Sequence, residues 1–223
     1  DFTPFEQYEN VSLRYVERPA DLRQPDMIIL PGTKSTVSDL LWLRQSGLEA
    51  AIQKLAAKGI LVLGICGGYQ MLGKTISDTE QTESSGITQI SGMGLLDTET
   101  VFREQKVQTQ VKGSFHSIEG RLSVLNGLSY EGYEIHMGRS EGIQLPLFGG
   151  GNVYGSYIHG FFDVPGICGA VLKSICENKG VDFDTLGTFD LKKYKEQQYD
   201  MLADTVRAGL DMDYVYRVLN REV

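Results

Sequence analysis

The 223-residue chain is poor in the residue types that metal sites and disulfide frameworks require. It contains three cysteines and three histidines. They fall at no ligand spacing such as CxxC or HExxH, so we expect no metal site. An odd number of cysteines cannot pair completely, which favours a reduced, cytoplasmic setting over a disulfide scaffold. Cys168 and Cys176 lie two helical turns apart, too far to bridge each other, and are expected to be buried apolar residues.

Basic residues are scarce relative to acidic ones. The chain has 21 Lys and Arg against 29 Asp and Glu, a net charge of −8. This balance argues against nucleic acid or an anionic membrane surface as a partner. No apolar run approaches the roughly 20 residues of a membrane span, and the first residues do not form a signal peptide. Those residues also lack an initiating methionine, and we expect the chain to be the C-terminal part of a longer polypeptide.

A nucleotide-binding P-loop is also missing. Such a loop requires the pattern GxxxxGK[ST]. The nearest match, Pro31–Ser35, supplies only the fragment Gly-x-Lys-Ser. We therefore expect no ATP site in this chain.

The strongest positive feature is the stretch Ile60–Gly73, which reads ILVLGICGGYQMLG. Its apolar start predicts a buried strand, and a helical pattern follows the glycines around Cys66. Strand, sharp turn and helix form a nucleophile elbow, here with Cys in place of Ser. The glycines are needed because the backbone bends sharply there, and the helix N-terminus favours a thiolate. Cys66 is therefore a candidate nucleophile, the alternative being a buried Cys in a strand.

The remaining chain gives a pattern of alternating strands and helices in its first part, followed by strands alone. We predict strands over residues 11–17, 26–30, 60–66, 98–102, 107–111, 132–135 and 153–158, and helices over 37–58 (interrupted at Ser46-Gly47), 165–179 and 191–219. The alternation predicts an α/β fold with a mostly parallel central sheet flanked by helices. The later strands predict an antiparallel extension. Residues 77–94 read as a loop, and the last helical region divides near Gly209 or Asp211.

Other candidate residues follow the predicted strands. Ligands bind beyond the carboxyl ends of parallel strands, where Gly32 and Gly67 would lie at one edge of the sheet. A base for Cys66 must come from a neighbouring strand end, which favours His159 over His136. Either histidine could instead be a hydrogen-bonded structural residue. His116 lies in a polar loop and is expected to be solvated.

These residues carry a resemblance to the class I glutamine amidotransferase domains, which have a flavodoxin-like fold. More narrowly, the chain resembles the C-terminal glutaminase portion of the cobyric acid synthase family. The resemblance covers residues 1–223 as one domain. The motifs that carry it are PGTKSTVSDLLWLRQSGL, LGICGGYQMLG, GYEIHMGRSEG, GSYIHGFFD and KEQQYDMLADTVRAGLDM.

The resemblance implies roles for four of these residues. Cys66 would attack the side-chain amide of glutamine and form a glutamyl thioester. His159 would pass the proton to the departing ammonia and then activate water. Backbone N–H groups of Gly32 and Gly67 would form the oxyanion hole.

Five further residues are candidates for substrate contact or for orienting the histidine. Gln70, His136 and Arg139 are candidate contacts of the glutamine substrate, although Gln70 and Arg139 could equally be solvated surface residues. Common class I members carry His-Pro-Glu, in which the Glu orients the His. This chain has His159-Gly160-Phe161 instead. Either a dyad suffices, or Glu134 or Asp163 serves as the third member from another position.

The resemblance also implies a partner. In that family an ATP-dependent synthetase domain precedes the glutaminase domain and amidates corrinoid carboxylates with the ammonia. ATP and Mg²⁺ would belong to that other domain, and this one would need no cofactor. Alternative functions are an amidotransferase subunit for lipid II amidation, a catalytically degenerate binding module on the same fold, and a Cys-His peptidase.

Overall fold

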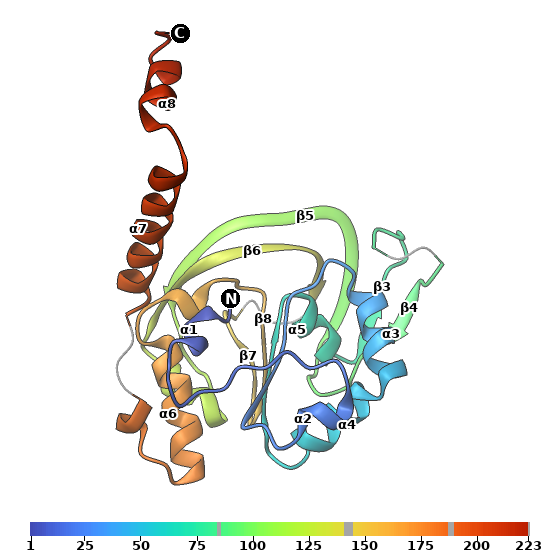
Figure 1. The fold of residues 1–223 in the computed structure, drawn as a ribbon. Helices are drawn as coiled ribbons and strands as arrows, with labels where there is room; N and C mark the ends of the chain where they lie inside the picture. The colour runs from blue at the N-terminus through green and yellow to red at the C-terminus, as the bar shows by residue number, and fades with distance from the viewer. Residues whose placement is uncertain (84–85, 141–144, 187–189, 223) are drawn as a thin grey trace. The chain divides into compact units, whose positions relative to one another are not determined.

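The computed structural model describes residues 1–83, 86–140, 145–186 and 190–222. The chain forms two compact units, Asp1–Gly187 and Thr188–Val223. The first unit contains two β-sheets with helices, and the second is helical (Figure 1). Each unit is considered by itself.

The central sheet of the first unit is mostly parallel, as predicted. Among the described residues its order is β1-β2-β8-β7. The strands β1 (Met27–Leu30), β2 (Leu61–Ile65) and β8 (Val153–Ser156) run parallel, and β7 (Phe148–Gly150) pairs antiparallel with β8. Every residue of β2 and β8 is buried. The unbroken apolar run that identified β2 in the sequence therefore reflects a strand covered on both faces.

Helices flank this sheet, and they follow one another along the chain in the order that the sequence predicts. They are α3 (Thr36–Ser46), α4 (Leu48–Ala56), α5 (Gly67–Leu72) and α6 (Ile167–Lys179). The predicted break falls at Gly47, whose φ of 81° separates α3 from α4, and Gly180 ends α6 with a φ of 67°. One apolar core joins α3, α4 and α5 to β1, β2 and β8 through side chains that include Leu40, Leu43, Ile52, Val62 and Leu72.

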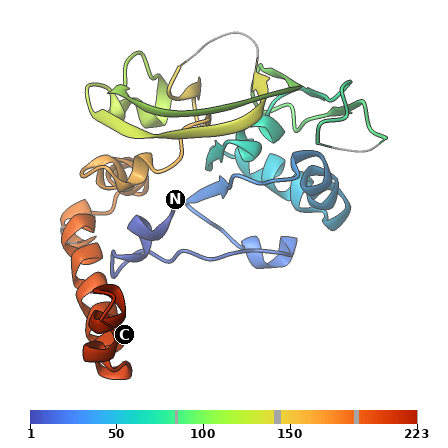
Figure 2. The same ribbon diagram turned by 90° about the horizontal axis from the view of Figure 1, so that it is seen from above.

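The second sheet is the predicted extension, with order β4-β3-β5-β6 in the described part of the chain. It comprises β3 (Thr75–Ser77), β4 (Gln89–Ser91), β5 (Glu99–Ser114) and β6 (Ser129–Ser140). The two strands predicted at 98–102 and 107–111 are one long strand whose register shifts between Phe102 and Val107. The long β5–β6 pair curves beside the central sheet (Figures 1 and 2). The loop predicted over 77–94 is wrong in part, because short β4 pairs with β3 there.

The strand predicted over Val11–Glu17 is wrong. The segment connects α1 (Thr3–Glu6) to α2 (Pro19–Leu22) and forms no ladder. Alternating apolar and polar residues make a segment suitable for a strand, but a strand also needs a partner. No described strand lies in register beside this one.

Short 3₁₀ helices complete the first unit: η1 (Gly120–Leu125), η2 (Phe161–Asp163) and η3 (Phe183–Leu186). The second unit comprises α7 (Leu191–Gly209) and α8 (Met212–Leu219), divided at Leu210 close to the predicted position. Asp190 and Asp211 cap them, each accepting a hydrogen bond from a backbone N–H three residues on. In the part of the chain that the structure describes, no helix is long and apolar enough to cross a membrane.

Candidate active site

The nucleophile elbow predicted around Cys66 is present. The strand β2 ends at Ile65, α5 begins at Gly67, and Cys66 between them has φ 50° and ψ −110°. A positive φ is strained for a residue with a side chain, and such strain gathers at functional sites. Two backbone hydrogen bonds hold the turn: Cys66 donates to the carbonyl of Ser156 at 2.7 Å and accepts from the N–H of Gln70 at 3.0 Å.

The glycines of the elbow allow three segments to approach closely. A Cβ at Gly64 would lie 2.6 Å from the backbone of Gly68, and a Cβ at Gly67 would lie 2.5 Å from Cγ2 of Thr33. A Cβ built at Gly68 would clash with the carbonyl oxygen of Leu30. Since Leu30 ends β1, the turn after β1 lies against the turn after β2. The predicted proximity of the two glycine turns is therefore confirmed.

His159 borders the same space as Cys66. A Cβ built on Gly32 would lie 2.8 Å from Cε1 and 3.5 Å from Nε2 of His159, and 3.5 Å from Cβ of Cys66. The imidazole of His159 and Cβ of Cys66 therefore both lie next to Gly32. The Nε2 atom is buried and has no hydrogen-bond partner among the described residues. A buried ring nitrogen that has no partner and borders the same space as a cysteine is a candidate to exchange a proton with it.

The other ring nitrogen of His159 is held by a carboxylate that sequence reasoning missed. Nδ1 lies 2.8 Å from Oδ2 of Asp1, whose Oδ1 accepts a hydrogen bond from the Gly160 N–H at 2.7 Å. The His159 and Asp1 side chains are 12% and 19% exposed. A proton fixed on Nδ1 leaves Nε2 of the neutral ring as an acceptor. No sequence motif connects the two residues, which lie 158 positions apart.

The carboxylate that faces Nδ1 of His159 in the structure is that of Asp1, and a role for Glu134 or Asp163 as third member stays a prediction. Glu134 contacts the other histidine, with its Oε2 3.1 Å from Nε2 of His136. Asp163 lies in η2, where its backbone N–H donates to the carbonyl of Gly160.

The second sheet contacts both Cys66 and His159. Tyr133 and His159 exchange two backbone hydrogen bonds, of 3.1 and 2.8 Å, and their rings stack with centroids 5.1 Å apart. The carbonyl of Ile135 accepts a hydrogen bond from Cys66 Sγ at 3.5 Å. The strand β6 therefore positions the thiol and the imidazole together, which is the structural contribution of the antiparallel extension.

His136 is a buried, fully engaged histidine. Its Nδ1 lies 2.7 Å from the carbonyl oxygen of Gly138, and its ring stacks on Tyr157 with centroids 3.9 Å apart. With Nε2 against Glu134, neither ring nitrogen is available as a base for Cys66. The preference for His159 is supported by this geometry, and contact of His136 with substrate stays a prediction.

Gln70 and Arg139 differ in their surroundings. Gln70 is 2% exposed. Its Oε1 accepts from the Thr36 hydroxyl at 3.1 Å, and its Nε2 donates to the Tyr157 hydroxyl at 3.4 Å. The alternative of a solvated Gln70 is therefore wrong. Arg139 is exposed on β6 and donates to Oε1 of Gln105 at 3.2 Å. Their contacts with glutamine stay predictions.

The other two cysteines are buried, as expected. Burial raises the pKa of Cys168 to about 12, and burial also raises the pKa of Cys176. With a pKa of about 12, Cys168 supplies almost no thiolate near neutral pH. Within the described residues, no three His, Cys, Asp or Glu side chains come together as a metal site would require.

Comparison with known proteins agrees with this geometry. The CobB/CobQ-like glutamine amidotransferase domain matches residues 1–167. The chain belongs to this family. The resemblance drawn from the motifs around Cys66 and His159 is therefore confirmed.

Curated relatives extend the match. The chain is 44% identical over 248 residues to a cobyric acid synthase of Lachnoclostridium phytofermentans, covering 100% of this chain and 48% of that protein. It is 42% identical over 247 residues to the cobyric acid synthase of Ruminiclostridium cellulolyticum, covering 100% of this chain and 47% of that one. The chain thus spans about half the length of these relatives.

Solved structures support the fold alone. A glutamine amidotransferase crystal structure matches with a TM-score of 0.55 and 16% identity, covering 81% of this chain and 92% of that one. PurLQS from Thermotoga maritima matches with a TM-score of 0.50 and 17% identity, covering 80% of this chain and 91% of that one. The predicted α/β fold is therefore confirmed.

Proposed function

We propose that this domain hydrolyses the side-chain amide of glutamine through a thioester on Cys66. One arrangement carries the proposal: the strained elbow presents Cys66 beside the unpartnered Nε2 of His159, whose Nδ1 is held by Asp1. Nucleophile, base and orienting carboxylate are the parts that acyl transfer requires.

The reaction runs in two halves. Nε2 of His159 takes the proton of the Cys66 thiol while Sγ attacks the amide carbon of glutamine. The tetrahedral intermediate collapses as His159 returns that proton to the nitrogen, which leaves as ammonia. Water then attacks the thioester, with His159 accepting its proton, and glutamate and the free thiol are released. Asp1 stabilises the imidazolium in both halves, because its carboxylate faces Nδ1.

The oxyanion of each intermediate needs donors aimed at its oxygen. The backbone N–H groups of Gly32 and Gly67 are our candidates, since both glycines lie in the turns that meet at Cys66. Gly67 is the first residue of α5, where an N–H has no acceptor within the helix. Each such donor is typically worth about 3 kcal/mol in the transition state.

We further propose that the ammonia serves ATP-dependent amidation of corrinoid carboxylates in a full-length, cytoplasmic cobyric acid synthase. The names of the relatives support this assignment, and so does their length, about twice that of this chain. ATP and Mg²⁺ would bind in the other half of that protein, and this domain would need no cofactor.

Glutamine hydrolysis by the purified protein tests the first proposal. Glutamate release should fall by a factor of about 10³ or more in Cys66→Ser, since the reaction passes through the thiol, and stay near wild type in Cys168→Ser. Acid quenching followed by mass spectrometry should find the glutamyl adduct on the peptide that contains Cys66. Equal turnover in wild type and Cys66→Ser would overturn the proposal, and binding without turnover in the wild type would indicate a degenerate module.

A separate assay tests ammonia delivery in the full-length protein. Cys66→Ser should abolish glutamine-dependent amidation of the corrinoid but keep amidation driven by added ammonium salt. Loss of both reactions to the same extent would contradict a role for Cys66 limited to ammonia supply.

A further inference from the structure

Two groups restrain the edge of the His159 imidazole. Asp1 faces Nδ1, and a Cβ on Gly32 would lie 2.8 Å from Cε1. A hydrogen bond at Nδ1 fixes the place of that atom but still allows the plane of the ring to rotate about it. The direction in which Nε2 points therefore depends on what covers the faces of the ring.

One face of the imidazole is covered by the ring of Tyr133. The two rings are nearly parallel, with an angle of 12° between their planes and centroids 5.1 Å apart. This distance lies within the range of about 4.5–7 Å in which aromatic rings attract each other in an offset stack. A ring stacked in this way opposes the rotation that the bond to Asp1 permits.

The backbone of β6 brings Tyr133 to this place. Tyr133 and His159 form an antiparallel bridge through backbone hydrogen bonds of 3.1 and 2.8 Å. Residues directly opposite each other in such a pair carry their side chains on the same face. A Cβ on Gly132 would lie 2.2 Å from the carbonyl oxygen of His159, so glycine is needed for this close approach.

Burial does not explain an aromatic side chain at this position. Tyr133 is 44% exposed although its ring covers the imidazole. On the same strand, Tyr130 packs instead on Phe115, with centroids 4.9 Å apart. Since an exposed ring contributes little to the core, a substitution at Tyr133 should alter the contact with His159 more than it alters the stability of the fold.

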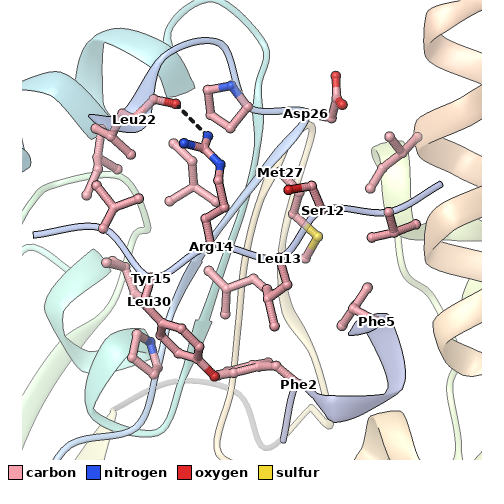
Figure 3. A pocket seen from close by; sticks show the side chains of 18 of the residues that line it. Phe2, Phe5, Ser12, Leu13, Arg14, Tyr15, Leu22, Asp26, Met27 and Leu30 are labelled. Carbon is pink, nitrogen blue, oxygen red and sulfur yellow. Dashed lines mark hydrogen bonds between the residues drawn. The ribbon is translucent and has the colours of Figure 1, made fainter. Parts of the chain in front are cut away.

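Tyr133 is also separate from the lining of the large cavity in the first unit. Figure 3 shows side chains around that cavity, among them Leu13 and Met27. The described residues that line it include neither Tyr133 nor His159. A substitution at Tyr133 therefore acts at the imidazole and leaves the cavity lining unchanged.

We propose that Tyr133 is a positioning residue for the base of the proposed reaction, and that its ring stabilises the imidazolium form of His159. The face of an aromatic ring carries partial negative charge and attracts a cation. In the reaction that we propose, His159 becomes a cation when it accepts the proton of Cys66 and again when it accepts that of water, and Asp1 faces the same charge from the ring edge. Because the attraction is stronger in these states than with the neutral ring, it lowers the barrier. The inference rests on the proposed function for these steps, and on the observed stack for its geometry.

Steady-state kinetics of the full-length protein provide the first test. Tyr133→Leu should lower kcat for glutamine hydrolysis by about 10-fold with little change in KM, because the stack acts on the imidazolium rather than on bound substrate. Tyr133→Phe keeps the ring and should recover kcat to within about 2-fold of wild type. Tyr130→Leu makes the same change elsewhere on β6 and should leave kcat near wild type. Equal losses in the two leucine variants, or a change in KM alone, would overturn the proposal.

A ring of altered charge separates electrostatics from shape. Pentafluorophenylalanine resembles phenylalanine in shape, but fluorine withdraws the electron density that attracts a cation. Incorporated at position 133, it should lower kcat about as far as Tyr133→Leu does, whereas Tyr133→Phe should not. The Tm of each variant shows whether it folds. Equal kcat with the two aromatic side chains would overturn the proposal, since ring shape alone would then account for the role of Tyr133.

Alkylation of Cys66 tests the same contact without glutamine. Because His159 must accept the proton of the thiol, iodoacetamide labelling near neutral pH should slow by about 5-fold in Tyr133→Leu, but not in Tyr133→Phe or Tyr130→Leu. Peptide mass spectrometry distinguishes Cys66 from Cys168. A wild-type protein whose labelling shows this dependence but which releases no glutamate would refute the proposed function and support the present inference. Equal labelling of Cys66 in all four proteins would overturn the inference, whatever the glutaminase activity.

Discussion

Nδ1 of His159 lies 2.8 Å from Oδ2 of Asp1, a residue 158 positions away in the chain. In the reaction that we propose, Asp1 supplies the orienting carboxylate that the sequence His159-Gly160-Phe161 lacks. The same carboxylate caps the N–H of Gly160, so its loss would free both the ring and the backbone that carries it.

Asp1→Asn should lower kcat for glutamine hydrolysis by about 100-fold or more with little change in KM. The amide cannot stabilise an imidazolium as a carboxylate does, and we expect no contact of Asp1 with the substrate because both carboxylate oxygens face His159 and Gly160. Steady-state glutamate release by the full-length protein measures both constants.

Glu134→Gln is the matched control for Asp1→Asn. It removes a carboxylate from His136 rather than from His159, so the loss of kcat should be much smaller. The reverse order of effects would assign the orienting role to Glu134.

Gly32→Ala should lower glutaminase activity by about 100-fold while leaving the fold intact. The added Cβ would lie 2.8 Å from Cε1 of His159 and must displace the ring. Displacements of about 1 Å can cost this much in rate. Gly150→Ala is the control, because a Cβ there meets nothing within 4 Å. Activity and Tm of both variants are compared, and an active Gly32→Ala protein would contradict the placement of His159.

Cys168 should resist alkylation in the folded protein. Burial raises its pKa to about 12, so at pH 8 only about one molecule in ten thousand carries the thiolate there. Iodoacetamide labelling followed by peptide mass spectrometry should modify Cys168 only after denaturation. Labelling of Cys168 at the rate of a free cysteine in the native protein would disprove this environment.

Glu83→Gln should stabilise the protein at neutral pH but not at acidic pH. Burial raises the pKa of Glu83 above its ordinary value, although a hydrogen bond from the Thr36 N–H acts the other way. The folded state therefore binds this proton more tightly than the unfolded state does. The resulting stabilisation is complete below the unfolded pKa and is lost as pH rises through the folded pKa.

Glu83→Gln does not lose stability in this way, because glutamine does not ionise. The difference in Tm between the variant and the wild type should therefore grow from about pH 4 to pH 7. Thermal unfolding of both proteins across this range gives the difference directly. A difference in Tm that is constant with pH would show that Glu83 ionises without penalty.

Local sequence determined the elements whose signal is contained within a short stretch. The apolar run and glycines around Cys66 predicted the strand, turn and helix of the elbow, because the bend itself requires small neighbours. Gly47 and Gly180 likewise ended helices where expected, since their left-handed φ values need no partner elsewhere in the chain. The family assignment rested on motifs of the same local kind.

Only the tertiary structure decided which distant groups meet. No pattern connects Asp1 to His159, because a hydrogen bond between residues so far apart depends on how the sheet edge is assembled. The sequence leaves open whether Gln70 contacts substrate or is solvated, and α5 in the structure turns it toward Thr36 and Tyr157. Val11–Glu17 shows the same limit: alternation predicts a surface suited to a strand, but pairing requires a neighbour, and no described strand pairs with this segment.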